Sequence, residues 1–227
     1  PWNFDERLRA QPNHPVTGVT WYEALAFCRW LEARWRERGW LTTDQQVRLP
    51  NEPEWEKAAR GGLAIPQDAI IVAVNSLSDL AIAFNPQSQI PNPNLKRRYP
   101  WGDDFNSELA NVRETGIGGT SAVGCFACGQ SVYACHDMSG NVADWTRSLY
   151  GFKASVLSVA RLEHPYPYAA DDERENIDAA TNVARVLRGG AFNYYHRDAR
   201  VAIRLGVLPV DRNEDYGFRV VVSPISL

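Results

Sequence analysis

Apolar and polar residues alternate at helical spacing in two segments near the start of the chain. In the first, Thr20 and Glu23 have the spacing of a capping box, in which each side chain accepts from the backbone N–H of the other residue. In the second, Asn51 is followed three residues later by another glutamate, and Gly61 provides a stop. The pattern predicts an amphipathic helix between Thr20 and Gly39 and a shorter helix between Asn51 and Gly61. The apolar positions of the longer helix are Ala24, Phe27, Cys28, Leu31 and Trp35.

Beyond the second helix, Pro, Gly, Asn and Asp divide the chain into short segments. Residues 185–187 and 219–222 are rich in β-branched side chains and are strand candidates. Residues 63–94 combine an apolar run with a tail rich in Pro and Asn, which is typical of an insertion. We therefore expect one α+β domain over residues 1–227, with two helices and a loop-rich mixed sheet.

Composition narrows the classes of partner. The 227 residues carry 24 basic and 27 acidic side chains, a net charge of −3, which disfavours nucleic acid and anionic membranes as partners. No stretch approaches the roughly 18 consecutive apolar residues of a membrane span. Because the chain starts at Pro1, we expect an N-terminal part to be missing. The compartment stays open, with the cytoplasm favoured.

Two glycine-rich frames bracket an irregular segment near the C-terminus. Arg188-Gly189-Gly190 precedes it and Gly217-Phe218-Arg219 follows it. Residues 191–216 between them follow neither a helical nor a strand period. A fixed frame around an irregular segment favours a binding surface, and ordinary packing in strands and loops is the alternative. The candidate ligand-binding residues are Asn193, Tyr194, Tyr195, His196, Asp198, Val201, Ile203, Leu205, Gly206, Val207, Leu208, Val210 and Tyr216.

These side chains fit a protein or peptide ligand. Tyr194, Tyr195 and Tyr216 offer rigid amphipathic contact area, as tyrosines do in antibody paratopes. The aliphatic residues from Leu205 to Val210 would form an apolar patch. His196 and Asp198 would add polar specificity.

Several segments together resemble the formylglycine-generating enzyme family, also called the sulfatase-modifying factor domain. They occur in the order of the family along nearly the whole chain. The resemblance implies a C-type-lectin-like fold with two helices and long loops on a compact sheet. The matching segments are 14–16, 19–24, 48–56, 58–62, 99–102, 137–145, 187–190 and 217–219.

The same resemblance bears on activity. In oxidase members, two cysteines after the Arg-Gly-Gly segment bind copper, and their positions fall on or near Tyr194 and Ala199. No cysteine follows Cys135, and Cu(I) prefers soft thiolates, so we expect neither copper nor the oxidase reaction. The chain resembles more closely the variable proteins of diversity-generating retroelements, whose C-terminal segment is rewritten by adenine-directed mutagenesis. We expect a non-enzymatic binding protein, and the alternative is a formylglycine-generating or related oxygen-dependent oxidase.

Two metal sites are considered. The resemblance maps calcium ligands onto Asp137, Gly140, Val142 and Asp144, as carboxylates and backbone carbonyls, which are hard donors suited to calcium. Capping of a turn without metal is the alternative for the two aspartates.

The second candidate metal site is a group of cysteines. Cys125, Cys128, Cys135 and His136 have the ligand types of a zinc site. A disulfide from Cys125 to Cys135 or to Cys128 is another possibility, and buried free thiols are favoured. Cys28, on the apolar face of the first helix, is expected in the core.

Overall fold

Both expected helices form in the computed structural model, which describes residues 12–79, 88–152 and 162–225. Helix α2 (Trp21–Glu37) starts with the expected capping box: the Thr20 hydroxyl accepts from the Glu23 N–H at 3.2 Å, and the Glu23 carboxylate accepts from the Thr20 N–H at 2.8 Å. Helix α3 (Glu52–Arg60) repeats the arrangement with Asn51 as its N-cap. The two capping motifs therefore predict both helix starts correctly.

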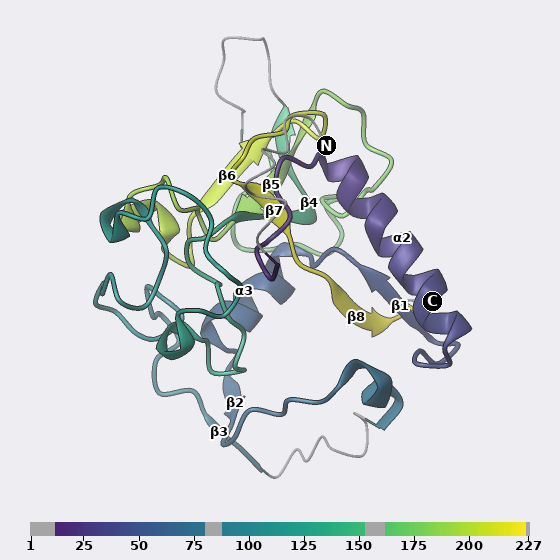
Figure 1. Ribbon diagram of the computed structural model, residues 1–227. Helices are drawn as coiled ribbons and strands as arrows, with labels where there is room; N and C mark the ends of the chain where they lie inside the picture. The colour runs from purple at the N-terminus through teal and green to yellow at the C-terminus, as the bar shows by residue number, and fades with distance from the viewer. Residues whose placement is uncertain (1–11, 80–87, 153–161, 226–227) are drawn as a thin grey trace.

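The central element is a four-stranded sheet in the order β6-β5-β4-β7 (Figure 1). Strands β4 (Ala143–Phe152), β5 (Val183–Arg188) and β6 (Arg204–Val207) pair in antiparallel fashion. Strand β7 (Tyr216–Phe218) lies on the other side of β4 and runs parallel to it. The sheet is thus mixed, as expected for an α+β domain.

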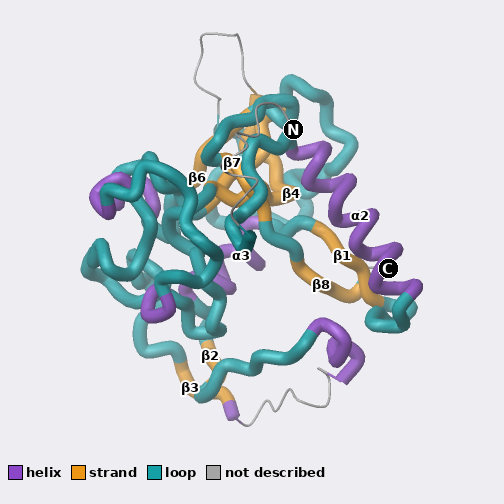
Figure 2. The backbone as a smooth tube through the Cα atoms, viewed as in Figure 1, coloured by secondary structure: helices purple, strands orange, loops and turns teal. Residues whose placement is uncertain are grey.

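Two smaller sheets complete the strands (Figure 2). Strand β1 (Gln45–Arg48) pairs with β8 (Val221–Pro224), and β2 (Ala64–Pro66) pairs with β3 (Gln89–Pro91). The expected C-terminal strand is therefore displaced. Its first two residues lie between β7 and β8, because Arg219 reaches inward to a buried carboxylate instead of joining a ladder.

The remaining elements are short 3₁₀ turns in long loops: η1 (Val74–Asp79), η3 (Arg113–Thr115), η4 (Ala127–Gly129) and η5 (His196–Ala199). The expected insertion begins and ends as the β2–β3 pair, and Leu77 of η1 packs against the main core. Its residues 80–87 lie outside the described part of the chain.

The main hydrophobic core lies between α2 and the central sheet. Trp21 and Trp145 are fully buried there, and each indole N–H is bonded: Trp21 donates to the Thr146 carbonyl at 2.9 Å, and Trp145 donates to the Val19 carbonyl at 3.0 Å. Cys28 is 2 % exposed, so its expected place in the core is confirmed. Burial of such side chains contributes roughly 1.5–3 kcal/mol each. The core fixes β4 and β5; the first frame starts at the last residue of β5, and the second starts on β7, which pairs with β4.

Candidate functional site

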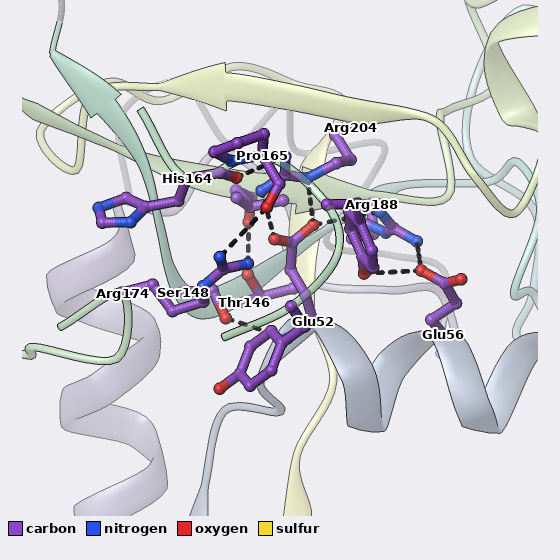
Figure 3. Close-up of polar contacts among 12 residues, drawn as sticks. Glu52, Glu56, Thr146, Ser148, His164, Pro165, Arg174, Arg188 and Arg204 are labelled. Carbon is purple, nitrogen blue, oxygen red and sulfur yellow. Dashed lines mark hydrogen bonds and ion pairs between the residues drawn. The ribbon is translucent and has the colours of Figure 1, made fainter. Parts of the chain in front are cut away.

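The N-terminal frame is held by a buried ion-pair network (Figure 3). The Arg188 guanidinium, fully buried, lies 3.1 Å from Glu52 Oε1 and 2.8 Å from Glu56 Oε2, both on α3. Glu52 also accepts from Arg204 of β6, at 2.6 Å from Nε and 2.5 Å from Nη2. A buried charge is costly unless it is paired, so each member depends on the others. The network therefore ties the end of β5 to α3 and β6.

The C-terminal frame is held by a second buried carboxylate. Arg219 Nε donates to Asp144 Oδ2 at 2.6 Å, and Arg219 Nη2 donates to the Asp137 carbonyl at 3.0 Å. The Trp55 indole N–H donates to the same Asp144 oxygen at 2.8 Å. Asp144 is 1 % exposed. The arginine of each frame is thus paired with a buried carboxylate.

Both frames meet at one residue of β4. Asp144 lies opposite Arg188 of β5 in the antiparallel pair and opposite Gly217 of β7 in the parallel pair. The segment between the frames therefore starts and ends at strands that flank the same position.

The glycines of the first frame are required by their surroundings. Gly189 and Gly190 have φ values of +92° and +68°, in the left-handed region that favours glycine. A Cβ on Gly190 would lie 2.9 Å from the Ala199 Cα and from the Asp198 carbonyl oxygen. The close approach packs the turn at η5 against the frame.

Tyr195 presents its ring at the surface beside this turn. It is 42 % exposed, and guanidinium groups lie over its ring from Arg113, at 4.7 Å from the ring centroid, and from Arg197, at 5.1 Å. Arg113 is brought there by its backbone, whose N–H donates to the Tyr194 carbonyl at 2.9 Å. An exposed ring flanked by two cations offers contact area with a positive rim.

His196 is held against the neighbouring loops. Its Nδ1 lies 2.8 Å from the Tyr99 hydroxyl, its ring stacks on Phe105 at 4.5 Å, and its backbone N–H donates to Glu114 at 2.9 Å. Together these contacts fix the backbone on which Tyr195 is displayed. Asp198 is half-buried, and its carboxylate lies 3.7 Å from Arg197.

The side chains of Asn193 and Tyr194 lie beside a buried carboxyl group, that of Asp215. Asp215 is 1 % exposed, and both side chains lie near enough to favour its charged form. Burial raises the pKa of Asp215 above its ordinary value, and burial also raises the pKa of the Tyr194 phenol. Asp215 Oδ1 is buried without a hydrogen-bond partner among the described residues. Tyr194 is therefore partly a structural residue, whereas Asn193 remains exposed.

The second half of the segment departs from the expected surface patch. Leu205 and Val207 lie on β6 and pack against the main core, and Gly206 faces the Tyr150 ring, where a Cβ would lie 2.4 Å from a ring carbon. Tyr216 packs edge-on against Trp145 at 5.8 Å. Ile203 and Leu208 are half-buried, and Val210 is 49 % exposed.

Val201 was expected to contact a ligand, and the structure contradicts that prediction. It is fully buried, in a core cluster with Trp55, Ala59 and Met138, and its carbonyl accepts from Arg188 Nη2 at 2.7 Å. A residue with no exposed surface cannot contact a ligand. The residues predicted from sequence thus divide into a surface group at Asn193–Asp198, the half-buried strand β6 and a core residue.

Of the four residues mapped as calcium ligands, the two aspartates already have hydrogen-bond partners within the protein. Asp144 already accepts from an arginine and an indole, and the Arg219 guanidinium also donates to the Asp137 carbonyl. The Asp137 carboxylate accepts from the Gly124 N–H at 2.8 Å. A cation brought to these oxygens would meet the Arg219 charge, since this guanidinium already neutralises the carboxylate that the ion requires. The arrangement instead matches the turn-capping alternative for Asp137.

The other metal predictions rest on the cysteines. The structure has Cys125, Cys128 and Cys135 as free thiols, as expected, but their expected burial is wrong: Cys125 and Cys128 are exposed and Cys135 is half-buried. Across residues 12–79, 88–152 and 162–225, no three His, Cys, Asp or Glu side chains gather as a metal site. The zinc alternative is therefore wrong for the described residues.

At the mapped copper positions, Ala199 is buried and Tyr194 is engaged with Asp215, so these two side chains do not fit copper either.

Four residues outside the bracketed segment contact Tyr195 or His196 and were not predicted from the sequence. Tyr99, Phe105, Arg113 and Glu114 come from loops remote in sequence. Their only signal was the family-like segment 99–102, which contains Tyr99 but says nothing of its contact with His196.

Comparisons with known proteins agree with this architecture. The sulfatase-modifying factor enzyme 1-like domain model matches residues 2–224. The chain is 29% identical over 216 residues to the serine/threonine-protein kinase pkn1 of Chlamydia pneumoniae, covering 94% of this chain and 25% of that protein. It is 26% identical over 233 residues to the formylglycine-generating enzyme of Thermomonospora curvata, covering 95% and 57%. It is 29% identical over 228 residues to the inactive C-alpha-formylglycine-generating enzyme 2 of Bos taurus, covering 93% and 51%.

A solved structure shows the same fold. The Treponema denticola variable protein 1 superposes with a TM-score of 0.54 at 22% identity, covering 95% of this chain and 73% of that one. The chain spans a quarter of the kinase and about half of the two formylglycine-generating-enzyme relatives. No described helix is both long and apolar enough to cross a bilayer. With its model matching nearly end to end, the chain belongs to the sulfatase-modifying factor enzyme 1-like family.

Proposed function

We propose that this chain is a non-enzymatic ligand-binding protein that displays a diversified C-terminal surface. The observation that carries the proposal is the contrast between the frames and what lies between them. Arg188 and Arg219 are bound to buried carboxylates, whereas Tyr195 between them is 42 % exposed. A rigid frame lets side chains change without unfolding the scaffold.

The binding surface is centred on Tyr195. Asn193, Arg197 and Asp198 lie on the same turn, and Arg113 comes from η3. A tyrosine ring has few rotatable bonds, so it loses little conformational entropy when it contacts a ligand. The ligand is a protein or peptide whose contact region complements an aromatic ring with a positive rim.

The decisive test is to sequence the DNA that encodes residues 188–223 together with its neighbourhood. A near-identical non-coding repeat, with adenines at the codons for Asn193, Tyr195 and Asp198, beside a reverse transcriptase gene, would support a diversified surface. The codon for Val201 is the internal control, because this residue is buried and a change there would disturb the core. Absence of the repeat, with identical residues in independent isolates, would refute diversification.

The rival function is a formylglycine-generating or related oxygen-dependent oxidase, as in the Thermomonospora relative's name. In the family's oxidases thiolates hold the copper, whereas this chain has Tyr194 and Ala199 at the mapped positions, so the rival function requires other copper ligands. Titration with Cu(I) in competition with a chelator separates the two functions. Tight stoichiometric binding that survives replacement of the four cysteines by serine would favour the oxidase.

A further inference from the structure

A cavity of about 200 Å³ lies between α2, β1 and β4, away from the proposed binding surface. In Figure 1, α2 and β1 are on one side of the central sheet, and the loops that carry η3 and η5 are on the other. The cavity is smaller than the roughly 300 Å³ from which drug-sized ligands begin, so it suits a small molecule. Its apolar lining consists of Leu25, Cys28, Val47, Leu49 and Ile177.

The apolar lining is electrically neutral. Cys28 could in principle carry a negative charge, but burial raises the pKa of its thiol to about 12, so it stays protonated at neutral pH. A small neutral thiol on α2 leaves space that a larger side chain would fill. The lining therefore favours an apolar group on the ligand.

The polar lining is dominated by arginines with unused donors. Arg48 gives both terminal nitrogens to Glu54 and the Leu49 carbonyl, but its buried Nε has no hydrogen-bond partner in the described residues. Arg147 Nε is 3.3 Å from Glu175 Oε2, yet neither atom makes a well-aligned hydrogen bond there. Arg29 is exposed and forms no ion pair with a described residue.

The acidic groups nearby are already engaged. Glu32 is the carboxylate in the lining, and it accepts from Arg36, at 3.1 and 2.9 Å, and from the Val47 N–H at 2.9 Å. Glu175, beside Arg147, has its pKa raised by burial and is bonded by Ser148 and Tyr168. An entering anion thus meets the guanidinium groups of Arg29, Arg48 and Arg147 in the lining, and an entering amine finds no free carboxylate there.

We infer that this cavity binds a small carboxylic acid, with its carboxylate at Arg29, Arg48 and Arg147 and its apolar group against Leu25 and Cys28. Guanidinium and carboxylate match in shape and charge, and a charge-assisted hydrogen bond is roughly twice as strong as a neutral one. The site is separate from the surface at Tyr195, so it goes beyond the function proposed above.

The test uses three probes with one carbon skeleton: 4-methylpentanoate, 4-methylpentanamide and 4-methylpentylamine. Binding is measured by calorimetry and located by NMR shifts of the Cys28 and Val47 amides. We expect saturable binding of the acid, binding of the amide at least about tenfold weaker, and no binding of the amine. Equal affinity for acid and amide, or no saturation by the acid at tens of millimolar, would overturn the inference.

Variants of the lining give an independent check. Arg29→Gln and Arg147→Gln should each weaken acid binding by roughly threefold to tenfold, and Leu25→Trp should abolish it by filling the cavity. Arg34→Gln is the matched control, because Arg34 is an exposed arginine of the same helix outside the lining. If Arg147→Gln fails to fold, Arg29→Gln and Leu25→Trp still decide. Unchanged acid affinity in both would sink the assignment, and Tyr195→Ala should leave acid binding unaffected.

Discussion

Replacing Glu52 by glutamine probes the network that holds the first frame. Glu52 is fully buried and accepts from Arg188 at 3.1 Å and from Arg204 at 2.6 and 2.5 Å. Glutamine has nearly the same shape, but it removes the negative charge and turns an amide donor toward a guanidinium. Breaking a buried pair in this way costs about 3–5 kcal/mol. For a domain of this size, that lowers the Tm by roughly 6–20 °C.

The assay is urea unfolding together with a thermal melt, with Glu37→Gln as the matched control. Glu37 pairs with Arg34 at the exposed end of α2, where an ion pair contributes less than about 1 kcal/mol. Adding Arg204→Met to Glu52→Gln should recover part of the loss, because it removes one unpaired guanidinium. If Glu52→Gln melted within about 2 °C of the wild type, the network would not be what fixes the frame.

Three further predictions concern the bracketed segment. Burial raises the Asp215 pKa above 3.8, so the folded state holds the proton more tightly than the unfolded state. The stability of the wild type therefore falls as the pH rises through the pKa of the folded state. Asp215→Asn has no such loss, so its Tm should rise relative to that of the wild type from about pH 4 to about pH 7. Tyr194→Phe removes a half-buried hydroxyl that favours the charged form of that carboxyl and should cost about 1–3 kcal/mol in urea unfolding, whereas the exposed Tyr195→Phe should cost less than about 0.5 kcal/mol. Millimolar calcium should leave the Tm unchanged, because Arg219 already neutralises Asp144.

Each of these has a clear contrary outcome. A Tm difference between Asp215→Asn and wild type that is constant with pH would show that Asp215 does not titrate abnormally. Equal losses for the two phenylalanine variants would place Tyr195 in the packed interior. A rise in Tm with calcium that EDTA reverses, and that Asp144→Asn abolishes, would restore the metal site.

The sequence predicts the helices well because their signals are local. Thr20 with Glu23, and Asn51 with the glutamate three residues on, specify hydrogen bonds within a single turn. The same holds for Cys28, whose position on an apolar helix face predicts its burial. Such features need no knowledge of where the rest of the chain lies.

The candidate site was less predictable because it depends on contacts remote in sequence. Val201 and Val210 are the same residue type in the same irregular segment, yet Val201 is fully buried and Val210 is half exposed. What separates them is the position of Trp55 and Met138, which lie on other elements. The surroundings of Asp144 were hidden for the same reason, since only the fold reveals that Arg219 reaches this carboxylate.

The meeting of both frames at Asp144 has a consequence for loop length. Because β5 and β7 flank one strand, the ends of the intervening segment stay roughly 10 Å apart, two strand spacings, whatever the segment contains. For a flexible loop with fixed ends, the closure entropy grows only logarithmically, by about 0.6 kcal/mol per doubling of length. Strand β6 is an internal anchor, so extra residues would be accommodated on either side of it, near Arg197 or near Arg212. Both arginines are exposed, so an insertion there would meet solvent and not the core. This fold can therefore vary the reach of the displayed surface as well as its chemistry.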